Sequence, residues 1–325
     1  MRVLGINDGH GSSVAVLDVE PYLILIGGTG FPKEAFERGE VTMDGIDAVA
    51  LATIVQGTRE TMLKQLSPRL HAFYEGNLPF VRTASPRLFK YLVMKRNRER
   101  VAQVRALGFG GPVFAVEHHM AHAASAYYSS PWWKDHDVLV LTLDGAGDGL
   151  CATVNIGEGG KLRRIAQTTS ENSLGYFYGH VAGMLDMTPQ EVMDAEVARA
   201  MPSHAESLRA LREYIGLDGL EFVKKFSEPI HELPRRVLNE ILRFGRADVA
   251  VGLQRLTEEL VLEWVRRAVR ETGISRVAAA GGVFLNTKAN HIVRSHPDVK
   301  AFFVPPHPGD ESTSLGAAQW VRHGR

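Results

Sequence analysis

Two strand–turn–strand units with matching glycine-rich turns stand far apart in this chain. In the first, residues 2–7 and 13–18 are apolar runs typical of strands, joined by the turn Asp8-Gly9-His10-Gly11. Residues 137–156 repeat the design around Asp144-Gly145-Ala146-Gly147-Asp148-Gly149. Asp8 aligns with Asp144, 136 residues later. This spacing is far longer than that of a solenoid repeat, so the pattern predicts a duplicated α/β domain.

The remaining pattern alternates between strands and helices. We expect strands at 46–53, 113–116, 277–280 and 302–304, and helices at 58–75, 85–107, 246–272 and 314–320. Residues 171–245 are expected to be mostly helical. This order indicates the α/β class, with a mixed sheet in each half.

Composition limits the partners and the compartment. The 325 residues suffice for two domains, and 37 basic side chains balance 37 acidic ones. This balance argues against a nucleic-acid binder driven by bulk charge. The N-terminus lacks the apolar core of a signal peptide, and no run of 18 apolar residues predicts a membrane span. We therefore expect a cytoplasmic protein that binds neither nucleic acid nor membranes.

Two histidines four residues apart, His118 and His122, lie in a segment typical of a helix. At that spacing both imidazoles lie on one helix face, where they can supply half of a transition-metal site. A third ligand is needed, and the carboxylate of Asp310 is the best candidate. The alternative is a chance pair on a helix face.

Each glycine-rich turn also has two interpretations. Glycines allow backbone amides to approach a phosphate, and the neighbouring Asp can hold a metal or a water. Asp-Gly is equally common in plain hairpin turns. The presence of two matching turns in a duplicated frame favours a functional role.

A run of small residues, 278–282, leads into Asn286. Such a strand end with a Gly-Gly pair suits a nucleotide or its ribose packed against the backbone. The alternative is a tight strand-to-helix turn in which Asn286 caps the following helix.

The segment 82–105 contains eight basic residues and one acid, Glu99. We interpret it as a solvated helix face, with a docking surface as the alternative. The single cysteine, Cys151, follows the second turn in an apolar strand. We predict a buried, unreactive thiol.

Together these segments resemble the NodU/TobZ-type O-carbamoyltransferases, which belong to the superfamily of actin, sugar kinases and heat-shock chaperone ATPases. Relatives are the TsaD-type tRNA threonylcarbamoyl transferases and the HypF proteins. The resemblance rests on six stretches in the family's order, namely 5–13, 118–128, 143–149, 173–176, 281–286 and 309–318.

The resemblance implies two RNase-H-like lobes, at 1–130 and 131–325, with a cleft between them and a helical insertion at about 171–245. The C-terminal helix is expected to pack back onto the first lobe. It implies that His118, His122 and Asp310 hold iron, zinc or manganese, and that a nucleotide lies against Gly281, Gly282 and Asn286. His10 would lie near the transferred carbamoyl group, with Asp8 as a second catalytic residue. The other expected contacts of ATP or carbamoyl-adenylate are Gly9, Gly11, Ser12, Asp144, Gly145 and Gly147.

The chain also departs from the family's pattern. Family members continue into a YrdC-like domain, in which the carbamoyl-adenylate is thought to form, and this chain ends at Arg325. A nucleotide-binding segment of the family appears as 194–204, with Glu196 and Arg199 in place of Lys and Gly. The motif after the first strand reads His10-Gly11-Ser12-Ser13.

Three functions follow from this pattern. The first is transfer of a carbamoyl group from carbamoyl-adenylate to a hydroxyl or amine of a small molecule, with a separate YrdC-like protein or another subunit as partner. The second is a catalytically degenerate scaffold or regulatory subunit that binds metal or nucleotide, alone or as a homo-oligomer. The third is a sugar-kinase-like phosphotransferase using Asp8 or Asp144 with magnesium, which leaves the histidine pair unexplained.

Overall fold

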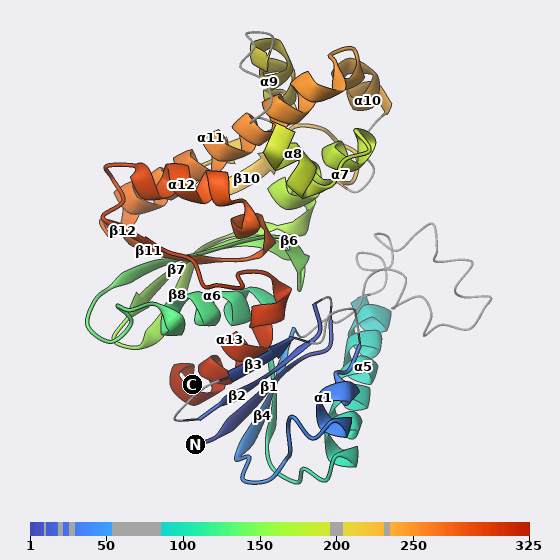
Figure 1. Ribbon diagram of the computed structural model, residues 1–325, viewed down its shortest axis with the longest axis vertical. Helices are drawn as coiled ribbons and strands as arrows, with labels where there is room; N and C mark the ends of the chain where they lie inside the picture. Colours follow the sequence, from blue (N-terminus) through green and yellow to red (C-terminus); the bar gives the residue numbers. More distant parts are fainter. Residues whose placement is uncertain (10, 19–21, 26–29, 54–85, 196–203, 231–234) are drawn as a thin grey trace, which may run out of the picture. The chain divides into compact units, whose positions relative to one another are not determined.

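The computed structural model describes residues 1–9, 11–18, 22–25, 30–53, 86–195, 204–230 and 235–325 (Figure 1). Contacts divide the chain into two compact units. Unit 1 comprises residues 1–121, 310–323 and 325, and unit 2 comprises residues 122–309 and 324. The expected helix at 58–75 lies outside the described residues.

Unit 1 is built on a five-stranded mixed sheet with the order β3-β2-β1-β4-β5. The first three strands of the chain pair antiparallel, whereas β4 runs parallel to β1 and β5 runs parallel to β4. The strands are β1 Val3–Asn7, β2 Ser13–Leu17, β3 Tyr22–Leu25, β4 Ala48–Ala52 and β5 Val113–Val116. β1, β2 and β4 are buried along their whole length, which explains their continuous apolar sequences.

Helices cover both faces of this sheet (Figure 1). Leu4 and Ile6 of β1 share a core cluster with residues of α1 (Lys33–Glu37) and α5 (Pro86–Ala106). Val3 packs on the other face against α13 (Thr313–Gln319), because alternate residues of a strand point in opposite directions. The C-terminal helix therefore belongs to unit 1.

Unit 2 repeats the architecture of unit 1. Its five-stranded sheet has the order β8-β7-β6-β11-β12, with β6, β7 and β8 antiparallel and with β11 parallel to both β6 and β12. The strands are β6 Val138–Gly147, β7 Leu150–Glu158, β8 Lys161–Thr169, β11 Arg276–Ala280 and β12 Ala301–Phe303. The same order and directions in both units confirm the duplicated α/β fold predicted from the repeat.

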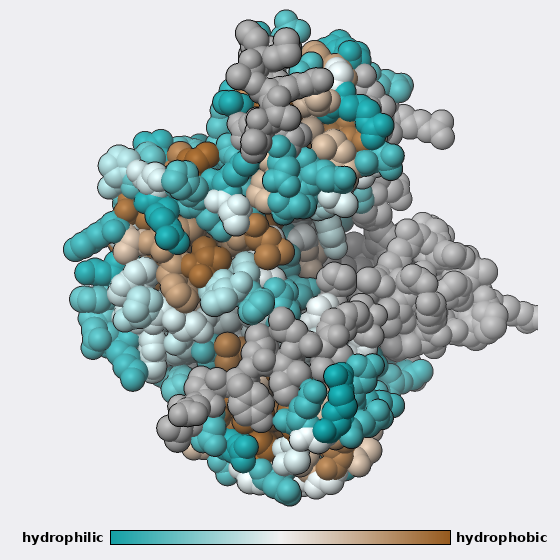
Figure 2. All heavy atoms as spheres, viewed as in Figure 1, coloured by the Kyte–Doolittle hydropathy of each residue, from teal (hydrophilic) through white to brown (hydrophobic). Residues whose placement is uncertain are grey.

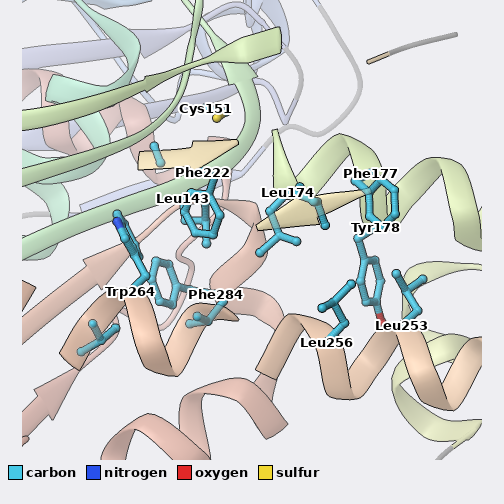
Figure 3. Close-up of a cluster of buried hydrophobic side chains, with 14 of the residues drawn as sticks. Leu143, Cys151, Leu174, Phe177, Tyr178, Phe222, Leu253, Leu256, Trp264 and Phe284 are labelled. Carbon is cyan, nitrogen blue, oxygen red and sulfur yellow. The ribbon is translucent and has the colours of Figure 1, made fainter. Parts of the chain in front are cut away.

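The helices of unit 2 surround one large core. They are α7 Leu174–Met184, α8 Pro189–Ala195, α9 His204–Arg212, α10 Arg235–Leu242, α11 Arg246–Thr272 and α12 Thr287–Ser295. Figure 3 shows Tyr178 of α7 reaching toward Leu253 and Leu256 of α11, and Phe222 lying near Trp264. The expected bounds of the long helix are confirmed, and it ends where Gly273 takes a left-handed conformation with φ of 70°.

The described part of the segment 171–245 is mostly helical, as expected, with α7 to α10 in it. It contains a hairpin of β9 (Ile215–Asp218) and β10 (Glu221–Lys224), which pair antiparallel across Gly219. Gly219 has a φ of 54°, which a tight turn requires. The hairpin forms because Phe222 is fully buried against Trp264, with ring centroids 5.2 Å apart. The hairpin is the part of this segment that the sequence analysis did not predict.

The units differ from the predicted ranges of 1–130 and 131–325 in two places. The division falls inside α6 (His118–Ser129), after Ala121, and residues 310–323 join unit 1. The physical reason for the second difference is the packing of α13 on β1, β2 and β4. Short helical turns complete the chain, namely η1 Ser170–Asn172, η3 Gly282–Leu285, η4 Asp310–Ser312 and η5 Trp320–Gly324.

Hydrophilic side chains cover much of the described surface on the face drawn in Figure 2. Among the described residues, the large apolar side chains with substantial exposure are Met1, Met94, Tyr176 and Leu285. No helix within the described ranges is both long and apolar enough to cross a membrane.

Candidate metal and nucleotide site

The helix α6 carries the histidine pair, and its first turn is fixed by Glu117. The Glu117 carboxylate accepts hydrogen bonds from the backbone amides of His119 at 3.0 Å and Met120 at 2.8 Å. These amides have no partner within the helix, and a carboxylate at this end also matches the helix dipole. His118 and His122 follow one turn apart, and both are buried.

In unit 1, His118 faces the predicted third ligand. Its Nε2 lies 3.5 Å from Oδ1 of Asp310, the first residue of η4. The backbone of Asp310 is held in place, because its carbonyl accepts from Nδ2 of Asn7 at 3.0 Å and from Oγ1 of Thr313 at 2.6 Å. Two of the three predicted metal ligands therefore lie side by side.

In unit 2, His122 faces a carboxylate that was expected to contact nucleotide. Its Nε2 lies 3.4 Å from Oδ2 of Asp144. The other oxygen, Oδ1, accepts from the backbone amides of Gly145 at 2.8 Å and Gly282 at 3.1 Å. These bonds orient the carboxylate toward the histidine. The sequence allowed Asp144 to hold a metal in its turn but did not predict that it would face His122.

Glycine is required beside Asp144. A Cβ at position 282 would lie 2.7 Å from Oδ1 of Asp144, and a Cβ at position 175 would lie 2.8 Å from the Asp144 carbonyl. Both distances are too short for real contacts. The small residues of these two motifs therefore allow the backbone to approach the carboxylate.

The ligand types in each unit fit a transition metal. His118 and Asp310 in unit 1, and His122 and Asp144 in unit 2, each offer an imidazole nitrogen and a carboxylate oxygen. Such ligands suit iron, zinc or manganese, whereas calcium and magnesium prefer oxygen ligands alone.

A pocket of about 280 Å³ lies in unit 2 next to Asp144. Its volume is near the lower end of small-molecule sites. Four predicted nucleotide contacts line it, namely Asp144, Gly145, Gly282 and Asn286. The other lining residues are mainly apolar and include Leu174, Tyr178, Pro189, Met193 and Leu285.

Asn286 has a structural role at the edge of this pocket. Its Oδ1 accepts from the amide of Ala289 and so caps α12, as the alternative interpretation predicted. Its side-chain amide also pairs reciprocally with that of the buried Gln254, at 3.0 and 2.9 Å. The Tyr178 hydroxyl donates to the same Gln254 oxygen at 3.0 Å, and burial raises the pKa of Tyr178. This network fixes the pocket wall.

The other predicted contacts lie apart from the pocket lining. In unit 1, the Gly9 amide donates to Asn7 Oδ1, Ser12 Oγ donates to the Gly30 carbonyl, and Gly11 takes a φ of 64° beside Asp310. In unit 2, Gly147 ends β6 and the Gly281 amide donates to the Pro308 carbonyl. His10 and most of the altered segment 194–204 lie outside the described residues.

Asp8, predicted as a catalytic residue, is held by two arginines of α5. Arg100 contacts both carboxylate oxygens, with Nε 3.0 Å from Oδ2 and Nη2 2.8 Å from Oδ1. Arg96 lies 3.3 Å from Oδ2. Because Arg100 is fully buried, the prediction of a solvated face for the whole segment 82–105 was wrong at this residue.

Cys151 is fully buried in β7, as predicted. Burial raises the pKa of its thiol to about 12. The burial and the raised pKa both favour a protonated, unreactive thiol at neutral pH.

The sequence profile of the family described as "Carbamoyltransferase N-terminus" matches residues 34–319. The chain belongs to this carbamoyltransferase family. As a family member it is similar to the nodulation protein NolNO of Sinorhizobium fredii, with 27% identity over 62% of this chain and 30% of that protein.

This member of the carbamoyltransferase family also matches the uncharacterized protein sll1178 of Synechocystis sp., with 27% identity over 65% of this chain and 37% of that protein. The chain thus spans well under two thirds of the length of these curated relatives. Among solved structures, full-length HypF in its phosphate- and nucleotide-bound form aligns with a TM-score of 0.51 and 14% identity, over 98% of this chain and 55% of HypF. The likeness shows the actin-like ATPase fold.

Proposed function

We propose that this chain transfers a carbamoyl group from carbamoyl-adenylate to a hydroxyl or amine of a small molecule. The observation that carries the proposal is the pair of His–Asp contacts on α6, His118 with Asp310 and His122 with Asp144. Membership of the carbamoyltransferase family supports the reaction class.

We infer that a divalent metal ion binds at the histidine pair of α6. The helix holds the two imidazoles one turn apart on one face, and each Nε2 lies near a carboxylate oxygen. When bound, the metal would polarise the donor's oxygens and offset the charge that develops as the acyl bond breaks. The surrounding amides of Gly145 and Gly282 orient Asp144 and fix the direction of its second oxygen.

The pocket of unit 2 is the proposed nucleotide site. Its apolar residues suit an adenine base, and the Asp144 carboxylate can accept hydrogen bonds from the ribose hydroxyls. The nucleotide-bound form of HypF, which shares the fold, is consistent with this assignment.

The proposed reaction is an acyl transfer. The acceptor oxygen or nitrogen attacks the carbamoyl carbon, the bond from that carbon to the adenylate phosphate oxygen breaks, and AMP leaves. The acceptor proton passes to a base, for which His10 remains the prediction because a histidine titrates near neutral pH. A separate YrdC-like domain or protein is the proposed source of the carbamoyl-adenylate.

Elemental analysis of purified protein tests the metal site. Wild type, His118→Ala and His122→Ala should be compared with His119→Ala, which changes a buried histidine on the same helix outside the two pairs. We expect near-stoichiometric iron, zinc or manganese in wild type and His119→Ala, and its loss in the other two. A folded wild-type protein that stays metal-free after reconstitution would instead favour the scaffold function.

Transfer itself is tested with carbamoyl phosphate, ATP, a YrdC-like protein and a panel of hydroxyl and amine acceptors. The expected product is a carbamate formed with one AMP per transfer, absent in His118→Ala. ATP hydrolysis that persists in His118→Ala without a carbamoyl donor would point to the phosphotransferase alternative.

A further inference from the structure

Thr53 has an unusual backbone for its residue type. It follows β4, is 8% exposed and has a φ of 67°, in the left-handed region. A β-branched side chain rarely adopts this conformation because its Cβ crowds the backbone. Such strain persists only where surrounding contacts impose it, and it concentrates at functional positions.

Arg100 supplies the contacts that hold Thr53 in place. Its Nη1 donates to the Thr53 carbonyl at 2.6 Å, and its Nη2 donates to the Ala52 carbonyl at 2.6 Å. The guanidinium is fully buried and is also fixed by the carboxylate of Asp8. Because the planar guanidinium of Arg100 binds the Thr53 carbonyl, the Ala52 carbonyl and the Asp8 carboxylate at once, it restricts the conformation at the end of β4.

The hydroxyl of Thr53 reaches the first histidine of the pair. Oγ1 lies 3.0 Å from Nδ1 of His118, while Nε2 of the same ring lies 3.5 Å from Asp310. When Oγ1 accepts a hydrogen bond from Nδ1–H, the lone pair is left on Nε2, which is the tautomer a metal requires. Metal-binding histidines usually have such a partner on the second nitrogen.

We propose that Thr53, held by Arg100, is a positioning residue that sets the ring orientation and tautomer of His118 for metal binding. The inference rests on the proposed metal site. Both the strained backbone of Thr53 and the buried guanidinium of Arg100 then serve to position the His118 ring. The same guanidinium joins Asp8 at the end of β1 to Thr53 at the end of β4.

Metal affinity in the full chain, measured by competition against a chelator with zinc and cobalt, tests the proposal. Thr53→Val keeps the shape and removes the hydroxyl, Thr53→Ser restores a hydroxyl, and Thr153→Val makes the same change at a fully buried threonine of β7 in unit 2. We expect affinity to fall about 10–100-fold in Thr53→Val and to stay near wild type in the other two. The cobalt absorption spectrum should change in Thr53→Val alone.

A second measurement separates this proposal from that of the metal site. Nitrogen NMR of labelled histidine in metal-free protein reports the His118 ring directly. We expect one dominant tautomer in wild type and Thr53→Ser, and shifted ring-nitrogen signals in Thr53→Val and in Arg100→Lys. If wild type binds no metal but the ring-nitrogen shifts appear, the proposed metal site is contradicted, whereas the contact of Thr53 with His118 is not. Wild-type His118 signals in a folded Thr53→Val protein, or unchanged metal affinity, would overturn the role of Thr53.

Discussion

Arg100 and Asp8 form a fully buried ion pair, with Nη2 of the guanidinium 2.8 Å from Oδ1 of the carboxylate and no solvent exposure on either side chain. Removing charges from water is costly, and this pair offsets the cost through two-point contact and further hydrogen bonds to the carbonyls of Ala52 and Thr53. The pair therefore ties α5 to the ends of two central strands.

Replacing Arg100 by Met should destabilise the protein by about 3 kcal/mol, because the buried Asp8 carboxylate keeps only Arg96, 3.3 Å from its Oδ2, as a charged partner. Urea unfolding followed by circular dichroism measures the loss. Arg98→Met, at an exposed position of the same helix, is the matched control and should change stability by less than about 0.5 kcal/mol. The double variant Asp8→Asn with Arg100→Met should recover part of the loss. Equal free energies of unfolding for Arg100→Met and Arg98→Met would contradict the stabilising role of the Asp8–Arg100 pair.

Gly282→Ala should lower metal content, because the new methyl group would lie 2.7 Å from Oδ1 of Asp144 and displace the carboxylate from His122. Elemental analysis after reconstitution measures the effect. Gly179→Ala in α7, where a Cβ meets nothing within 4 Å, should keep its metal and gain up to about 1 kcal/mol of stability from helix propensity. Full metal occupancy in Gly282→Ala would count against Asp144 as a ligand.

Cys151 should resist alkylation by iodoacetamide at pH 8.5 in the folded protein and react after unfolding. Burial raises the pKa of its thiol to about 12, above the unfolded value of about 8.5. The folded state then holds the proton more tightly. The associated stability is fully present below pH 8.5 and is lost as pH rises toward 12. Mass spectrometry of the labelled protein follows the reaction, and rapid labelling of folded protein would contradict the burial.

Trp264→Ala should destabilise unit 2 by about 3–5 kcal/mol through the cavity it leaves. Trp264→Phe should cost less, because a ring remains against Phe222 while the Leu220 carbonyl loses the indole N–H donor at 2.8 Å. Thermal unfolding compares the two variants. The same melting temperature in both would show that the hydrogen bond, and not the ring volume, decides stability there.

Elements with strong local patterns could be predicted from the sequence. The two hairpins, the strand 113–116 and the helix 246–272 were expected and are present. Each combines an apolar run or helical spacing with a clear glycine boundary. The β9–β10 hairpin was missed although Asp218-Gly219 is a turn signal, because its strands stand among helices.

The candidate site also combines residues that the local sequence reveals with contacts that depend on the fold. His118 and His122 are visible in the sequence because both belong to one helix, whereas pairing Asp144 with His122 depends on how β6 and α6 meet in the folded unit. The burial of Arg100 is equally non-local. Its spacing of four from Arg96 shows that the two share a helix face, but only the fold brings Asp8 to that face. The strain of Thr53 has no sequence signature at all.

The matching strand order of the two units gives Asp8 and Asp144 equivalent places, each following the apolar part of the first strand of its sheet. Asp8 forms a buried ion pair with Arg100. Asp144 is instead oriented by the Gly282 amide toward His122. The two equivalent positions therefore differ in what their carboxylates can still bind. Both oxygens of Asp8 contact arginine inside the core, whereas Asp144 faces an imidazole with its Oδ2 and lines a pocket.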